Sequence, residues 1–302
     1  MRTLVMRTAL LALLIVPLLV AQAGERKFEK KFTVKSGEWL TLATDLGSVR
    51  VTGGSGSDVS VLVELRGRQK DVDNFDITAE QTGGGVDVRG RGSMTRGWFW
   101  NSSDLDVRYT ITVPRDYNAR LNTSGGNIEV GGLKGTVNGE TSGGDIRLNE
   151  IEGKVDMHTS GGNIRVEKVK GEVRMETSGG EIGVNAVTGS VDVNTSGGNV
   201  RISDVDGNVK SETSGGNIYV KVTGGNKGIY AETSGGNIEI RIAKSVGANI
   251  DAATSGGDVE CDLPVTVSGK ISESRIKGTV NGGGSVIYAH TSGGDVRIRA
   301  LD

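Results

Sequence analysis

The tetrapeptide Thr-Ser-Gly-Gly recurs along this chain at a nearly constant spacing, and this repeat restricts the fold more than any other feature. It begins at residues 123, 141, 159, 177, 195, 213, 233, 254 and 291 of the 302. The first five intervals are 18 residues, and the next are 20, 21 and 37. Degenerate copies begin near residues 44 and 82. Repeats of this length are typical of solenoids, in which each unit packs against its neighbours.

Aliphatic residues recur at fixed positions within each unit. With threonine as position 1, positions 6, 8, 11 and 15 are almost always Val, Ile or Leu, as in Ile164, Val166, Val169 and Val173. Alternation of β-branched and charged residues predicts strands. Glycines at positions 3, 4 and 13 predict the corners, because glycine adopts a positive φ at low cost.

This pattern predicts an all-β fold, a single-stranded parallel β-solenoid (β-helix) with about 18 residues per coil and roughly fourteen coils over residues 44–302. Each coil is expected to pair with the units before and after it, about 4.8 Å away. The 37-residue interval is read as two units, with a weak one around residues 274–276. A hexapeptide helix of the acyltransferase type is excluded, because positions 12 and 18 hold Lys170 and Glu176.

The two ends of the chain have different character. Residues 1–23 have basic residues, then an apolar run over residues 9–20 and a small-x-small tripeptide at 21–23, which predicts a cleaved signal peptide. No later apolar run is long enough for a transmembrane anchor. Residues 24–43 alternate apolar and polar residues and are expected to form capping strands. The protein is therefore expected to be periplasmic or extracellular.

The final unit, residues 291–302, stops after one strand. Val296 and Ile298 occupy its inward positions, and no further segment follows to cover them. An uncovered coil presents unpaired backbone groups and apolar side chains. We therefore expect association, if any, through this C-terminal coil, as a weak tail-to-tail homodimer.

Composition and residue spacing argue against several functional classes. The net charge of −2 argues against nucleic acid as a partner. The only two histidines, His158 and His290, are expected about 35 Å apart by coil spacing, too far for a shared metal or dyad. Glu212 and Glu232 should lie one coil apart, where a cation could bridge them, although surface carboxylates are the simpler interpretation. We predict no catalytic, cofactor or metal site, and no enzyme.

One segment interrupts the repeat. Residues 92–104, GSMTRGWFWNSSD, bring Trp98, Phe99 and Trp100 together in a chain with three tryptophans. Such a segment is either a flap over the solenoid or an exposed aromatic patch that binds a glycan, a lipid or a protein. These three residues are the candidate partner-binding site.

Several motifs carry a resemblance to a known family. Tandem TSGG[ND][IV]x[VI] units, each followed by V-x-G-x-V, and the lead-in TITVPRDYNARLNTSGG at residues 110–126 resemble the bacterial putative-adhesin domain family, a domain of unknown function. The resemblance implies a β-solenoid of the cell envelope or surface and no catalytic residues. The hypothesis is an adhesin-like binding or scaffolding module for an envelope protein or glycan. A self-assembling structural envelope protein and a periplasmic component of envelope stress signalling are the alternatives.

Overall fold

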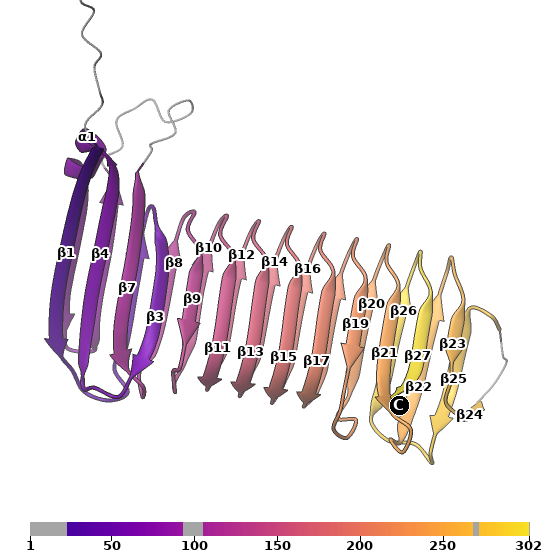
Figure 1. The fold of residues 1–302 in the computed structure, drawn as a ribbon. Coiled ribbons are helices and arrows are strands. Elements are labelled where there is room, and N and C mark those ends of the chain that lie inside the picture. Colours follow the sequence, from indigo (N-terminus) through magenta and orange to yellow (C-terminus); the bar gives the residue numbers. More distant parts are fainter. Residues whose placement is uncertain (1–22, 93–104, 268–271, 302) are drawn as a thin grey trace, which may run out of the picture.

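The computed structural model describes residues 23–92, 105–267 and 272–301. The chain forms two long sheets that face each other along the whole molecule (Figure 1). In the described part, the only helix is α1 (Gln69–Asp73), at the N-terminal end. None of the described helical structure is long and apolar enough to span a membrane. The predicted all-β solenoid fold is confirmed.

The described strands divide into sheet A, with 13 strands, and sheet B, with 14. In spatial order, sheet A contains β1 (Ala23–Thr33), β4 (Asp58–Arg68), β7 (Asp106–Pro114), β3 (Ser48–Gly54), β9 (Ile128–Gly131), β11 (Ile146–Glu152), β13 (Ile164–Lys170), β15 (Ile182–Thr188), β17 (Val200–Asp206), β19 (Ile218–Lys221), β21 (Ile238–Ala243), β27 (Val296–Leu301) and β23 (Val259–Cys261). From the same end, sheet B contains β5 (Phe75–Thr82), β6 (Gly85–Gly92), β2 (Trp39–Thr44), β8 (Asn118–Thr123), β10 (Val137–Thr141), β12 (Val155–Thr159), β14 (Val173–Thr177), β16 (Val191–Thr195), β18 (Val209–Thr213), β20 (Ile229–Thr233), β26 (Val286–Thr291), β22 (Ala248–Thr254), β25 (Arg275–Val280) and β24 (Val265–Val267).

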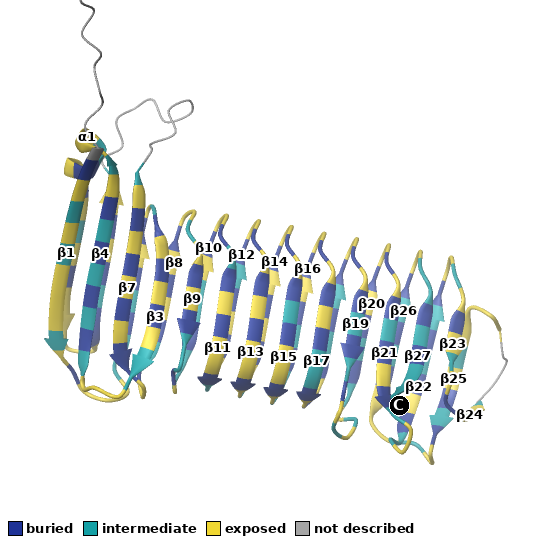
Figure 2. Cartoon of the chain, viewed as in Figure 1, coloured by how far each residue is buried: buried dark blue, intermediate teal, exposed yellow. Residues whose placement is uncertain are grey.

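Each regular coil gives one strand to each sheet. In sheet B, Val155 pairs in parallel with Val173, and Val173 pairs with Val191, so the register advances by one 18-residue unit per strand. The aliphatic residues at positions 6, 8, 11 and 15 are buried between the sheets, as predicted. Figure 2 shows the resulting bands of buried and exposed residues along the strands.

The repeated threonine is a buried corner residue. Thr159 is fully buried; its hydroxyl donates to the Gly144 carbonyl of the preceding coil at 2.9 Å and accepts from the Gly162 amide at 3.3 Å. The neighbouring position-5 side chains extend this network, since the Asn163 carboxamide oxygen accepts from the Glu181 amide of the next coil at 2.9 Å. The position-5 side chains therefore link successive coils through hydrogen bonds to the backbone.

Replacement of Thr159 by valine should lower the free energy of unfolding by about 1–3 kcal/mol, because it leaves two buried backbone groups without the hydroxyl. Ser160→Ala is the matched control, since Ser160 is the exposed neighbour. Urea titration of both variants measures the difference. Equal midpoints would contradict a structural role for the threonine hydroxyl.

The glycines serve two purposes, and only one of them was predicted. At position 13, Gly153, Gly171 and Gly189 have φ of 146°, 144° and 140°, as expected for a left-handed corner. Gly161 at position 3 and Gly162 at position 4 do not have a positive φ, and the expected conformational role is wrong at both positions. Glycine is required instead because a Cβ on Gly162 would overlap the Gly144 carbonyl oxygen of the preceding coil.

At both ends of the solenoid, spatial order departs from sequence order. The first coil, β2 and β3, lies between β6/β7 on one side and β8/β9 on the other. The last coil, β26 and β27, lies between β20/β21 and β22/β23. The expectation that each unit pairs with its sequence neighbours is therefore wrong at the ends.

The C-terminal coil is not the open end that the sequence suggested. Strand β27 is paired on both sides, and Val296 and Ile298 are fully buried. The weak unit expected around residues 274–276 is also wrong as a parallel coil, because β25 runs antiparallel to β22. The estimate of fourteen coils had included that unit. The predicted homodimer through Val296 and Ile298 therefore loses its structural basis.

The N-terminal end is closed by side chains that cross between the sheets. Strand β1 runs antiparallel to β4 at the edge of sheet A. From β1, Arg26 donates to the Phe75 carbonyl and Lys30 donates to the Ala79 carbonyl at 2.9 Å, both on β5 of sheet B. Inward-pointing charges of this kind protect a sheet edge. Strand β2, assigned to the same cap from the sequence, is an internal coil strand.

Candidate functional site

The predicted site residues Trp98, Phe99 and Trp100 lie outside the described residues, in the segment 93–104. This segment joins the end of β6 at Gly92 to the region before β7. The predicted signal peptide also lies outside the described residues, apart from Ala23 at the start of β1. Both remain predictions.

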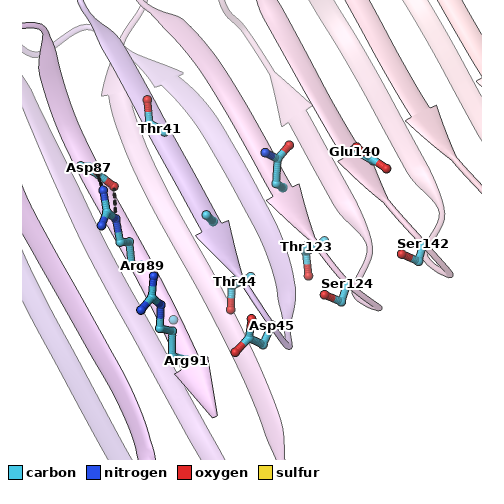
Figure 3. Close-up of a pocket in the computed structure, with 13 residues that line it drawn as sticks. Thr41, Thr44, Asp45, Asp87, Arg89, Arg91, Thr123, Ser124, Glu140 and Ser142 are labelled. Atoms are coloured by element: carbon cyan, nitrogen blue, oxygen red, sulfur yellow. Dashed lines mark hydrogen bonds and ion pairs between the residues drawn. The ribbon is translucent and has the colours of Figure 1, made fainter. Parts of the chain in front are cut away.

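An open polar groove lies beside the point where the aromatic segment begins. This N-terminal groove has a volume of about 510 Å³ and crosses the outer face of β6, β2, β8 and β10 (Figure 3). Its side chains come from four different coils. Most of them lie on strands, and two of them are serines at corners. They include Thr41, Arg89, Arg91, Asn122, Ser124 and Ser142.

The floor of the N-terminal groove is fixed by a contact through the core. The Tyr109 hydroxyl reaches from sheet A to the Thr44 hydroxyl in sheet B, at 2.8 Å. Burial raises the pKa of Tyr109 from its ordinary value of 10.0 to about 12. Gly90 on the floor leaves room for it, because a Cβ there would overlap the Tyr109 oxygen.

Charges line the rim of the same groove. The Arg89 guanidinium is paired with Asp87 at 2.8 Å, and this hydrogen bond raises the pKa of Arg89. Asp45 accepts from the Gly92 amide at 3.3 Å, at the last described residue before the aromatic segment. The groove therefore offers hydroxyls, amides and charges of both signs, which suits a polar ligand or partner.

The two histidines occupy equivalent positions on the outer face of sheet B. His158 on β12 and His290 on β26 are five strands apart, or about 24 Å. They are closer than the sequence order predicted, because the C-terminal coil directly follows β20 in space. The distance is still too long for a shared metal ion or catalytic dyad.

The two glutamates considered as a cation site are brought together, but other groups bind them. Glu212 and Glu232 are register partners on β18 and β20. Lys210 pairs with Glu212 at 2.7 Å, and the Tyr230 hydroxyl donates to Glu232. Among the described residues, no group of three or more His, Cys, Asp or Glu side chains is placed to hold a metal ion.

The sequence reading missed an aromatic stack near the C-terminal end of sheet B. The rings of Tyr230 and Tyr288 are parallel, with centroids 4.6 Å apart, and His290 stacks on Tyr288 at 3.8 Å. His290 also contacts Asp251 at 3.3 Å, and Arg275 pairs with the same carboxylate at 2.9 Å. The segments IYAET and IYAHT show the same pattern in the sequence, but they are 58 residues apart. Only the strand order shows that they are neighbours.

The family of the chain follows from a match over nearly its whole length. The model of the Toastrack DUF4097 family matches residues 38–299. The chain belongs to the Toastrack family. The resemblance read from the TSGG units is thereby confirmed, and no curated protein matches the sequence.

Solved structures similar to this Toastrack chain come from several bacteria. A putative lipid binding protein from Parabacteroides distasonis has 13% identity and a TM-score of 0.45, over 90% of this chain and 97% of its own. A putative adhesin from Bacteroides fragilis has 12% identity and a TM-score of 0.41, over 91% and 97%. A putative cell adhesion protein from Clostridium sporogenes has 11% identity and a TM-score of 0.26, over 92% and 100%. These similarities carry no functional argument.

Proposed function

We propose that this chain is an exported, non-enzymatic, adhesin-like module of the bacterial cell envelope that binds or scaffolds an envelope protein or glycan. The observation that carries the proposal is a stack of hydrogen-bonded coils with exposed positions along both sheets (Figure 2), most of them occupied by polar residues. Val286 is the only exposed large hydrophobic residue in the described part of the chain. Such a surface suits recognition by many polar contacts.

The proposed contact region is the N-terminal groove together with Trp98, Phe99 and Trp100. The groove supplies hydrogen-bonding groups, and the aromatic segment begins directly after Gly92 at its rim. Aromatic side chains next to such groups provide large contact area at low entropic cost, which is typical of binding sites.

Replacement of Trp98, Phe99 and Trp100 together by serine should abolish cross-linking of the envelope partner in intact cells and leave the β-rich circular dichroism unchanged. The matched control is Tyr288→Ser, which removes a half-buried aromatic side chain from the outer face of sheet B, far from the N-terminal groove. A strong decrease in melting temperature for the triple variant would show instead that the segment is a structural flap.

Further measurements separate the alternative functions. A purified protein that forms filaments would favour a self-assembling structural role. A periplasmic signalling protein as the single cross-linked partner would favour envelope stress signalling. Recovery of Met1 as the N-terminal residue of envelope-fraction protein would contradict cleavage near Gly24, and with it the proposed export.

A further inference from the structure

One glycine on the outer face of sheet A is not required by the fold. Gly183 lies inside β15, its φ is not positive, and a Cβ there would meet only the Ile164 carbonyl oxygen, at 3.9 Å. Gly180, three residues earlier, has no such space, because a Cβ would overlap the Gly162 carbonyl oxygen. A glycine inside a strand weakens it and often marks a place where a ligand approaches the backbone.

Gly183 leaves a gap between two exposed arginines. Arg165 on β13 and Arg201 on β17 are its register partners, so the two are about 9.6 Å apart with no side chain between them. The three strands lie side by side in Figure 1. The gap belongs to a groove of about 700 Å³, the Gly183 groove, which is also lined by Asn185, Ser203 and Glu167.

The charges of these two arginines are not neutralised by the described residues. In two other coils, position 5 is aspartate and pairs with the arginine at position 7, as in Asp145–Arg147 at 2.9 Å and Asp295–Arg297 at 2.7 Å. Position 5 is asparagine in the coils of Arg165 and Arg201. Neither arginine has an ion pair among the described residues, since their coils lack the position-5 aspartate that pairs with Arg147 and Arg297.

The nearby carboxylates form no ion pair with Arg165 or Arg201 in the described part. Asp204 is paired with Lys221 at 3.1 Å. Glu181, at position 5 of the Gly183 coil, accepts a hydrogen bond from the Asn199 amide group at 3.0 Å. Glu167 lies two residues from Arg165 on the same strand, without an ion pair to it in the described part. The Arg201 guanidinium instead lies over the Tyr219 ring, 4.3 Å from its centroid.

We propose that the Gly183 groove binds an acidic saccharide, with one anionic group over the backbone of Gly183 that is held by Arg165 on one side and, once it turns from the Tyr219 ring, by Arg201 on the other. Guanidinium groups bind carboxylate and sulfate oxygens through charge-assisted hydrogen bonds. The Asn185 amide and the Ser203 hydroxyl suit sugar hydroxyls, and Tyr219 offers an aromatic edge. The proposal does not depend on the N-terminal groove of sheet B, so either site can fail alone.

The test measures binding of the full mature chain to oligogalacturonate, to a heparin oligosaccharide and to neutral dextran by calorimetry at low salt. We expect binding to one or both acidic probes and not to dextran; the first probe identifies a carboxylate ligand and the second a sulfate ligand. The Arg165→Ala/Arg201→Ala double variant should bind at least about tenfold more weakly, given the strength of charge-assisted hydrogen bonds. Arg147→Ala, which removes an already paired arginine of the same row, should bind as the wild type does.

Gly183→Ile provides the decisive readout. Because the site above Gly183 is open and isoleucine favours strands, this variant should melt at a higher temperature while binding at least about tenfold more weakly. A structural role for the glycine would lower stability instead. No binding to either acidic probe, equal loss in Arg147→Ala, or full binding by Gly183→Ile would overturn the proposal.

Discussion

Gly162→Ala is expected to lower the free energy of unfolding by more than about 3 kcal/mol, since the added methyl group overlaps a backbone carbonyl that cannot move away. That carbonyl, on Gly144, already accepts the Thr159 hydroxyl. The corner that contains Gly162 is itself hydrogen-bonded to the next coil, so a shift of this corner would spread through several coils. Urea unfolding followed by far-ultraviolet circular dichroism measures the loss.

The neighbouring glycine provides a matched control for this prediction. Gly161 is exposed, its φ is not positive, and a Cβ on it would come no closer than 3.7 Å to the Ser142 carbonyl oxygen. Gly161→Ala should therefore change stability by less than about 1 kcal/mol and tend to raise it. Similar losses in both alanine variants would contradict the assignment of position 4 as the site of close coil approach.

Val173→Asp should destabilise the protein by about 4 kcal/mol or more, because it buries a charge that has no partner. Val173 is fully buried at position 15, where it pairs with Val155 on one side and Val191 on the other. Both neighbours are aliphatic, so neither can hydrogen-bond the carboxylate. Thermal melting of the purified variant checks this, and insoluble expression would be the extreme form of the expected result.

Arg174→Ala tests the opposite face of the same strand. Arg174 is exposed next to Asp156 and Asp192 on the adjacent strands. Loss of its charge should lower the free energy of unfolding by about 1 kcal/mol or less, because water and salt screen the attraction between exposed charges. A melting temperature as low as that of Val173→Asp would mean that the inward and outward positions have been exchanged.

The candidate sites were only partly predictable from the sequence. One repeat unit is enough to show that Arg165 lacks an aspartate partner, because positions 5 and 7 are only two residues apart in the sequence. The Tyr230–Tyr288 stack could not be predicted from one unit, since it depends on which coil follows β20 in space. The role of Gly183 also required the structure, because glycine alone does not reveal whether a side chain would collide or find space.

The sequence by itself determined the coil: its length, its strands and its inward aliphatic positions. These features repeat every 18 residues and depend on contacts within a unit or with an equivalent unit, so a local pattern encodes them. The regular middle, from β8 to β21, follows sequence order for the same reason.

Only the tertiary structure decided the order of coils at the two ends. Every coil presents nearly the same ladder of backbone groups and aliphatic side chains, so a terminal unit can stack on any free coil face with similar energy. The choice is made by the antiparallel strands that interrupt the repeat, β4 and β5 at one end and β25 and β24 at the other. Their pairing leaves the first and last coils of the chain enclosed between other coils. Contacts between strands that are distant in the sequence therefore set the order of coils at the ends.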